Sequence, residues 1–326
     1  MKKNIAIIMG GYSSEAAISI QSGNVVYKNL DKEKFDLFRI LISEDKWVYL
    51  DENDQEHPIN TADFTTTVNG YKIKFDFIFN AIHGHPGEDG TLLAYFDLLG
   101  LPYSSAPFYQ MAVAFNKRDC LSLLKPYGIQ TAESIYLNKG DKLSFEEIEK
   151  KLGLPCFVKP NRAGSSFGIS KVYTKEELGP ALDKAFEEDD EILIEQFLDG
   201  AEVSVGVIFW KGKIKVLPIT EIVSENDFFD YEAKYLGRSN EITPARISEI
   251  QKENVSAMAA KIYAVMKLKG LSRADFIFVG DQPYFIELNM VPGLSAESIL
   301  PKQAKEAGIS LASLFESTIQ LQKLRH

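Results

Sequence analysis

The order of apolar and polar positions predicts alternating strands and helices in the first third of the chain. Residues 4–9 form an apolar run that ends in two glycines, and a serine just after them could cap a helix over residues 13–30. Apolar runs at 35–42 and 75–82 predict two further strands, and a polar glycine loop follows at 83–90. This alternation predicts a parallel, doubly wound sheet with functional loops at the carboxyl ends of its strands.

From about Pro107 the pattern changes to that of a second lobe. A helix is predicted over 116–124 and strands over 156–158, 191–195 and 203–210. The segment 161–168, which reads NRAGSSFG, follows the first of these strands. Its small residues allow the backbone amides to close over an anion.

Two features mark the last third of the chain. Residues 223–243 show neither helical nor strand periodicity, and long loops of this kind are often lids over a site. After an amphipathic helix at 247–268, the runs 273–279 and 284–289 flank a turn and predict a β-hairpin.

The hairpin carries the most informative polar residues. Side chains two apart on a strand share a face, so Arg273 lies with Asp275, and Glu287 with Asn289. If the register pairs 275 with 287, all four converge, and two carboxylates with an amide oxygen suit magnesium. The alternative is a solvent-facing strand surface with an incidental salt bridge. The apolar residues interleaved with the four argue against open water.

Length and charge narrow the function classes. A chain of 326 residues suits two or three domains, and a net charge of −10 with scattered basic residues argues against a nucleic-acid surface. The apolar run near the N-terminus is too short for a signal peptide and no membrane-length segment follows, so a soluble cytoplasmic protein is expected. Cys120 and Cys156 are expected to be buried free thiols.

A metal site built from acids implies a polyphosphate, yet neither a Walker A nor a dinucleotide glycine motif is present. Three lysines stand in suggestive contexts: Lys117 in FNKRD, Lys159 in CFVKP and Lys234 in YEAKY. Any one of them alone could be a solvated surface charge. Lys159 interrupts an apolar strand before the glycine–serine loop, where a buried ammonium would need an anionic partner.

Together these features resemble the ATP-grasp superfamily and, more closely, the D-alanine:D-alanine ligase family. The similar runs, spread over essentially the whole chain, are MGGYSSEAAIS, IHGHPGEDG, VKPNRAGSSFG, FFDYEAKY, SRADF and IELNMVPGLSAES. The resemblance implies a mixed α/β ATP-grasp fold of three lobes. These would be a Rossmann-like lobe with a parallel sheet (1–105), a central lobe (106–193) and a C-terminal lobe (194–326). The C-terminal lobe would carry a mobile loop at 223–243, and ATP would be held between the central and C-terminal lobes.

For the nucleotide, the resemblance implies that lysines touch the phosphates, that a serine loop folds over them and that the adenine and ribose lie between two lobes. Two Mg²⁺ or Mn²⁺ ions would be held by Asp275, Glu287 and Asn289. The implied ATP-binding residues are Lys117, Lys159, Ser166, Glu195, Gln196, Phe197, Leu198, Glu202 and Lys234.

For the substrates, the resemblance implies an acid that binds the first D-alanine ammonium, two hydroxyls that link this acid to the mobile loop, and a guanidinium and a backbone amide that stabilise the oxyanion. The implied acid is Glu15, the two hydroxyls are those of Ser165 and Tyr235, and the oxyanion donors are Arg273 and the amide of Gly293; these five are the implied catalytic residues. The implied substrate-binding residues are His83 and Ser298.

The implied activity is ATP-dependent ligation of two D-alanines through D-alanyl phosphate, for peptidoglycan precursors, by a cytoplasmic homodimer. Several positions depart from the family pattern, among them Ala163, Gln196 and Phe229, with Met290, Val291 and Glu297 beside the second-substrate site. These last three keep open a ligase that joins D-alanine to another amino or hydroxy acid, whereas Tyr235 favours an amine nucleophile. A nucleotide-binding regulator without turnover is the non-enzymatic alternative.

Overall fold

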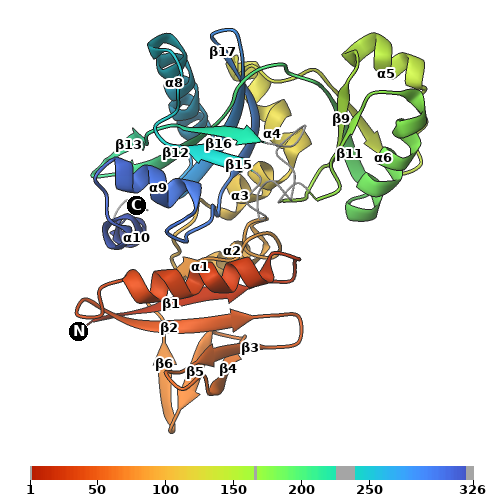
Figure 1. The fold of residues 1–326 in the computed structure, drawn as a ribbon. Coiled ribbons are helices and arrows are strands. Elements are labelled where there is room, and N and C mark those ends of the chain that lie inside the picture. Colours follow the sequence, from red (N-terminus) through yellow and green to blue (C-terminus); the bar gives the residue numbers. More distant parts are fainter. Residues whose placement is uncertain (1, 165–166, 225–238, 321–326) are drawn as a thin grey trace.

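The computed structural model describes residues 2–164, 167–224 and 239–320, and in these ranges it contains three β-sheets. Each sheet is built from one continuous part of the chain (Figure 1). None of the described helices is long and apolar enough to cross a membrane.

The N-terminal sheet has the strand order β6-β5-β4-β3-β2-β1-β7. Strands β1, β2 and β7 are parallel, as predicted, while β3 to β6 form an antiparallel extension that the sequence did not predict. Helix α1 packs on β1 and β2. The elements are β1 (Lys3–Gly10), α1 (Ala16–Asn29), β2 (Phe35–Ile42), β3 (Trp47–Leu50), β4 (Glu56–Asn60), β5 (Thr65–Val68), β6 (Tyr71–Lys74), β7 (Phe77–Asn80) and α2 (Thr91–Leu98).

The predicted serine cap of α1 is wrong. The N-cap is Glu15, without a side-chain hydrogen bond, so neither Ser13 nor Ser14 has that role. The hydroxyl of Ser13 instead donates to the carbonyl oxygen of His83 at 3.1 Å. The first glycine turn is thereby tied to the loop that follows β7.

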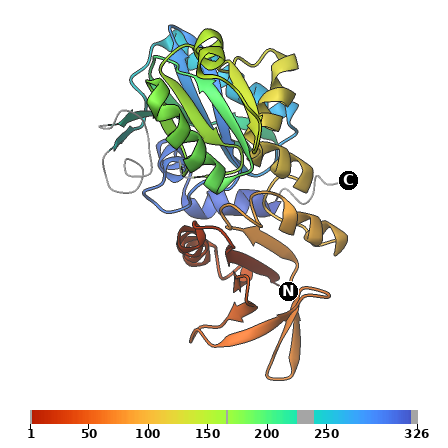
Figure 2. The same ribbon diagram turned by 90° about the vertical axis from the view of Figure 1, so that its right-hand side faces the viewer.

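The central part contains a four-stranded antiparallel sheet with the order β10-β9-β11-β8, flanked by α5 and α6 (Figures 1 and 2). The predicted helix at 116–124 is α4, capped by the Asn116 side chain. The elements are α3 (Phe108–Phe115), α4 (Lys117–Leu124), the 3-10 turn Lys125–Tyr127, β8 (Ser134–Asn138), α5 (Phe145–Leu152), β9 (Cys156–Pro160), β10 (Ser170–Val172), α6 (Lys175–Glu188) and β11 (Glu191–Gln196).

The C-terminal sheet has the order β15-β14-β12-β16-β17, with β13 paired to β12. Strands β14 and β15 pair with each other, so the prediction that residues 223–243 lack strand structure is wrong at both ends; residues 225–238 lie outside the described ranges. The elements are β12 (Glu202–Trp210), β13 (Lys213–Val216), β14 (Thr220–Ser224), β15 (Ser239–Ile242), α8 (Glu249–Val265), β16 (Leu271–Val279), β17 (Gln282–Asn289), α9 (Ile299–Glu306) and α10 (Leu311–Gln320).

One hydrophobic core joins the first lobe to the last. Ile5, Ile7 and Phe79 of the N-terminal sheet share it with Leu300 and Phe315 of the C-terminal helices. Burying these apolar surfaces together removes them from water and fixes the two lobes against each other. The loops after β1 and β7 line one cavity together with the hairpin β16–β17. Both cysteines are buried and free, as expected.

Candidate active site

The hairpin β16–β17 has the predicted register. Asp275 lies opposite Glu287 and Arg273 opposite Asn289. A slip of one residue would turn these polar side chains to the opposite face of the sheet, so the alternation of side chains along each strand favours this register. A β-bulge follows Asp275 and shifts the next pair to Phe276 with Phe285. The predicted convergence of the four polar residues is confirmed.

Asp275 is the centre of this cluster. Arg273 donates to both of its oxygens, from Nε at 3.1 Å and Nη2 at 2.9 Å. Asn289 Nδ2 donates to it at 3.0 Å, and the hydroxyl of Ser204 donates to it as well. Burial alone would lower the pKa of Arg273, but the Asp275 carboxylate outweighs burial and raises it. The guanidinium therefore stays charged, held rigidly in the cleft.

Two of the predicted lysines converge on the same region. The ammonium of Lys159, on β9, lies 2.6 Å from a carboxylate oxygen of Glu195, on β11. Burial would lower the pKa of Lys159, but Glu195 reverses this and raises it. Lys117 donates to the carbonyl oxygen of Ala163 at 2.8 Å and lies 3.5 Å from Glu287. The anionic partner expected for Lys159 is thus present as Glu195.

One cavity lies between the central and C-terminal sheets, lined by both lysines and both hairpin acids. Apolar side chains of Phe157, Ile277 and Ile286 complete its walls. A flat aromatic group fits between such apolar walls. A negatively charged group attached to it would meet the ammonium groups of the two lysines. Phe197 packs on Phe157 at a ring distance of 6.2 Å. Of the predicted ATP-binding and metal residues, those lining this cavity are Lys117, Lys159, Glu195, Gln196, Leu198, Glu202, Asp275 and Glu287.

A second, larger cavity opens on the other side of Glu287, between the N-terminal and C-terminal lobes. It joins the first glycine turn, the loop after β7, the hairpin and the N-terminus of α9. Ser298 is the N-cap of α9, and its hydroxyl is 2.8 Å from that of Ser295. The predicted residues lining this cavity are Glu15, His83, Arg273, Glu287, Asn289, Gly293 and Ser298.

Glu15 meets the loop of the central lobe at Gly164. A Cβ atom at Gly164 would lie 2.7 Å from Oε2 of Glu15, which is too close. The chain therefore has a glycine where the loop crosses the acid. Ser165, Ser166, Lys234 and Tyr235 lie outside the described residues, so their roles stay predictions.

The resemblance implies that Glu15 binds the first amino acid substrate. On that role we expect Gly164→Ala to raise the KM for this substrate by about tenfold, equivalent to about 1.4 kcal/mol, because the new methyl group displaces the Glu15 carboxylate. The KM for ATP should change little. Steady-state kinetics with each substrate varied in turn would measure both. Gly179→Ala is the matched control, since a Cβ at Gly179 meets no atom within 4 Å; equal effects of the two variants would contradict this prediction.

Sequence reasoning missed Glu88, which lines the second cavity. Its Oε1 accepts hydrogen bonds from the backbone N–H groups of Met290 at 3.1 Å and Val291 at 3.2 Å, and its Oε2 from that of Gly84 at 3.0 Å. Burial, with the charge of Glu15, raises the pKa of Glu88 to about 7. Glu88 thus joins the loops of two lobes. The only signal for it was its place in the GEDG run.

His83 is almost fully buried at the base of the same cavity. Its Nε2 is hydrogen-bonded to the hydroxyl of Ser22 at 3.0 Å, and its backbone N–H donates to Ser19 at 2.8 Å. Burial lowers the pKa of His83 to about 4, and the charge of Arg273 acts in the same direction. A hydrogen bond to the backbone of Val291 opposes this shift, and together with Ser22 it holds the neutral imidazole in place at the base of the cavity.

Comparisons with known proteins agree over nearly the full length. The family profile described as D-ala D-ala ligase N-terminus matches residues 4–106, and that described as D-ala D-ala ligase C-terminus matches residues 123–320. A D-alanine–D-alanine ligase of Flavobacterium johnsoniae is 64% identical over 98% of this chain and 99% of the relative. One of Christiangramia forsetii is 56% identical over 98% of each chain.

Solved structures are similar in fold. The D-alanine–D-alanine ligase of Bacillus anthracis complexed with ATP has a TM-score of 0.79 at 31% identity, covering 99% of this chain and 100% of that chain. The VanG D-Ala:D-Ser ligase of Enterococcus faecalis has a TM-score of 0.87 at 31% identity, covering 98% and 99%. The predicted mixed α/β fold of the D-alanine–D-alanine ligases is confirmed.

Proposed function

Because this chain belongs to the D-alanine–D-alanine ligase family, we propose that it joins two D-alanine molecules to D-alanyl-D-alanine, with ATP cleaved to ADP and phosphate. The observation that carries the proposal is the cluster of Arg273, Asp275, Glu287 and Asn289 on one face of a hairpin, with a cavity on either side. One cavity suits a nucleotide and the other two small zwitterions. The product is a precursor of peptidoglycan.

The chemistry requires an activated intermediate. A carboxylate is a poor electrophile, so the γ-phosphoryl group of ATP is transferred to one carboxylate oxygen of the first D-alanine, giving D-alanyl phosphate and ADP. The amine of the second D-alanine, after losing a proton, attacks the carbonyl carbon, and phosphate leaves as the peptide bond forms. Positioning and neutralisation of charge supply most of the catalysis in phosphoryl transfer.

On the nucleotide side, Lys117 and Lys159 would neutralise the phosphates. This role is supported by the positions of the two lysines, because both line the same cavity. Each also lies close to a carboxylate that phosphate oxygens could replace or join. The adenine would contact Glu195 and the backbone of Gln196, Phe197 and Leu198, and the ribose Glu202. The nucleotide would be held between the predicted lobes 106–193 and 194–326, while the predicted N-terminal lobe, 1–105, would contribute to the amino acid side.

The donor set of the hairpin fits magnesium or manganese. Two carboxylates and an amide oxygen are oxygen ligands, and Asn289 uses its amide N–H on Asp275, which leaves its oxygen as an acceptor. Asp275, Glu287 and Asn289 would hold two such ions, which would neutralise phosphate charge when bound. Arg273 holds Asp275 in place, whereas the Ser204 hydroxyl and the Asn289 amide N–H are single hydrogen bonds to Asp275 that a metal ion could replace.

On the amino acid side, Glu15 would bind the ammonium of the first D-alanine, and His83 would contact the same substrate. Arg273 and the backbone amide of Gly293 would donate to the oxyanion of the tetrahedral intermediate, and Ser298 would bind the second carboxylate. A positive guanidinium and an amide are the donors that such an oxyanion requires. Water exclusion over D-alanyl phosphate would fall to Ser165, Ser166, Lys234 and Tyr235.

The direct test is product formation from D-alanine as the only amino acid. Purified protein with ATP, Mg²⁺ and D-alanine should release ADP and phosphate in equal amounts, with D-alanyl-D-alanine identified by mass. Omitting Mg²⁺ should stop the reaction. Absence of ADP release with D-alanine alone would reject the proposal.

Lys159→Ala is expected to weaken ADP binding by about 10–100-fold, or about 1.4–2.8 kcal/mol, because it removes a buried positive charge from the phosphate end of the cavity. Titration calorimetry would measure this. Lys139→Ala is the control, since the Lys139–Asp190 pair is solvent-exposed. A Lys159→Ala protein that binds ADP as tightly as the unaltered chain would contradict the role.

A second acceptor is the main alternative, because Val291 and Glu297, which depart from the family pattern, line the second cavity, and a structurally similar relative is a D-Ala:D-Ser ligase. The relatives described above at 64% and 56% identity are D-alanine–D-alanine ligases, which disfavours this reading. A screen of D-amino acids and D-hydroxy acids as second substrates would decide between them. A homodimer in the cytoplasm completes the proposal, testable by sedimentation.

A further inference from the structure

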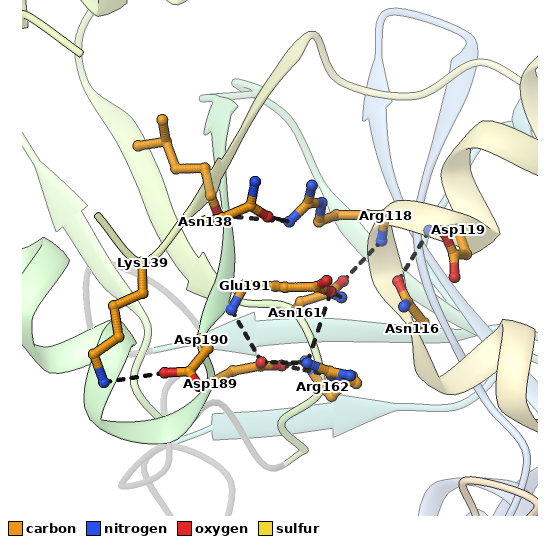
Figure 3. A network of polar contacts seen from close by, with 11 residues as sticks. Asn116, Arg118, Asp119, Asn138, Lys139, Asn161, Arg162, Asp189, Asp190 and Glu191 are labelled. Carbon is orange, nitrogen blue, oxygen red and sulfur yellow. Dashed lines mark hydrogen bonds and ion pairs between the residues drawn. The ribbon is translucent and has the colours of Figure 1, made fainter. Parts of the chain in front are cut away.

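The side chain of Asn161 is fully buried and has a partner for both of its polar atoms. Its Oδ1 accepts from the backbone N–H of Arg118 at 2.9 Å, and its Nδ2 donates to Oε2 of Glu191 at 2.8 Å. Figure 3 shows Asn161 between the start of α4 and the segment that leads into β11. A buried amide whose oxygen and nitrogen are both hydrogen-bonded fixes the segments that it joins.

Asn161 completes the N-terminus of α4. The first N–H groups of a helix lack partners within the helix. Here the N–H of Lys117 donates to the Asn161 carbonyl oxygen at 3.3 Å, that of Arg118 to the Asn161 side chain, and that of Asp119 to Asn116 at 3.0 Å. Asn161 thus supplies two of the three acceptors. Because Asn161 follows Lys159 by two residues, it ties the backbone of one lysine to that of the other.

The next residue anchors the glycine–serine loop. The Arg162 guanidinium makes two parallel bonds to Asp189, from Nε at 2.9 Å and Nη2 at 2.7 Å, and its backbone N–H donates to the same carboxylate at 2.8 Å (Figure 3). The Asp189 side chain is only 5% exposed. Bidentate pairs of this type add geometric precision as well as energy. These bonds therefore fix the path of the backbone where it leaves β9.

On the other side of the loop's base, the Lys117 ammonium donates to the carbonyl oxygen of Ala163. Residues 161–163 are consequently held from both sides, by α4 and by the segment between α6 and β11. None of the three side chains at 161, 162 and 189 lines the nucleotide cavity, whereas Lys117, Lys159 and Ala163 do.

We propose that Asn161 and the Arg162–Asp189 pair are positioning residues for the nucleotide phosphates, which hold Lys117, Lys159 and the base of the glycine–serine loop at a fixed separation. ATP then meets an arranged site, with less ordering cost on binding. The proposal rests on the proposed use of ATP and adds to it the residues that set the spacing of the phosphate-binding groups.

The first test is a polarity swap. In Asn161→Asp, a carboxylate would face Glu191 where the amide of Asn161 now donates to it. The two negative charges repel, so the contact between the segment at 161 and Glu191 should break. We expect the dissociation constant for ADP and the KM for ATP to rise about tenfold, or about 1.4 kcal/mol, with the KM for D-alanine unchanged. Adding Glu191→Gln restores a donor on the other side of the pair and should return ADP affinity to within about threefold of the original. Failure of the second change to rescue affinity would overturn the role of Asn161.

The second test uses two neighbouring acids. Asp189→Asn removes a charge from a bidentate pair whose acid is only 5% exposed, whereas Asp190→Asn changes an acid that is 75% exposed and pairs with Lys139. Only Asp189→Asn should weaken ADP binding. Equal ADP affinity in both variants, or a loss of unfolding stability in Asp189→Asn without a change in ADP affinity, would overturn the proposal. ADP binding is measured without amino acid, so it does not depend on dipeptide formation. If the unaltered protein binds ADP but forms no dipeptide, the proposed reaction is rejected, while the proposed positioning role can still be tested.

Discussion

Replacing Arg273 by lysine is expected to lower kcat by about 10²–10³-fold, the usual cost of removing one oxyanion donor, which is the role that we propose for its guanidinium. The ADP affinity should stay nearly unchanged. The guanidinium lies in the second cavity and is fixed by two bonds to Asp275. A lysine ammonium cannot bond Asp275 in the same bidentate manner and also reach the oxyanion. Stopped assays of ADP release with saturating D-alanine would measure kcat.

Lysine is a sharper probe than alanine at this position. Arg273→Ala would leave the buried Asp275 without its cation, a change that typically costs about 3–5 kcal/mol of stability and would confuse the result. Arg246→Lys is the matched control, because Arg246 bonds both oxygens of Glu221, at 2.8 and 3.0 Å, outside either cavity. If ADP affinity of Arg273→Lys fell as far as kcat, the guanidinium would serve the nucleotide and not the intermediate.

The hairpin shows what local pattern can predict. The apolar runs at 273–279 and 284–289, with a turn between them, predicted both strands. The convergence of the four polar residues was predicted on the condition that Asp275 pairs with Glu287, and the structure has that register. The bulge after Asp275 did not follow. It depends on the backbone of the neighbouring strand and of the turn, which no periodicity records.

The N-terminal lobe shows the limit of the same reasoning. Its buried parallel strands are continuous apolar runs and were found, whereas β3 to β6 are short and partly exposed, as in Tyr71–Lys74, and have weak patterns. The positioning network was invisible for another reason. Asn161, Arg162 and Asp189 look like ordinary loop residues, and only the tertiary structure brings residues nearly 30 positions apart into contact.

Glu88 and His83 give the largest expected effect on stability, and their signs are opposite. The pKa of Glu88 is raised to about 7 by burial and Glu15, so its contribution is fully present below its unfolded pKa and is lost as pH rises toward 7. The pKa of His83 is lowered to about 4 by burial, so its contribution is present above its unfolded pKa and is lost as pH falls toward 4. Between these limits the two slopes largely cancel in the unaltered chain.

Glu88→Gln should expose the slope of His83. The amide cannot titrate, so the free energy of unfolding of the variant is expected to rise by about 1.4 kcal/mol per pH unit from pH 4.5 to 6.5, where these two groups make the unaltered chain nearly flat. Relative to the unaltered chain, the variant should gain about 3 kcal/mol between pH 4.5 and 7. The lost hydrogen bond to Gly84 lowers stability equally at every pH and leaves this slope intact.

Urea unfolding at half-unit pH intervals would measure the difference between the two proteins. Glu297→Gln is the control, because the Glu297 side chain is 90% exposed and its neutralisation should shift stability by the same small amount throughout. Parallel curves for Glu88→Gln and the unaltered chain would mean that Glu88 is ionised in the folded protein at acidic pH. Its charge would then have to be balanced by the three backbone N–H groups that it binds, since Glu15 adds only repulsion.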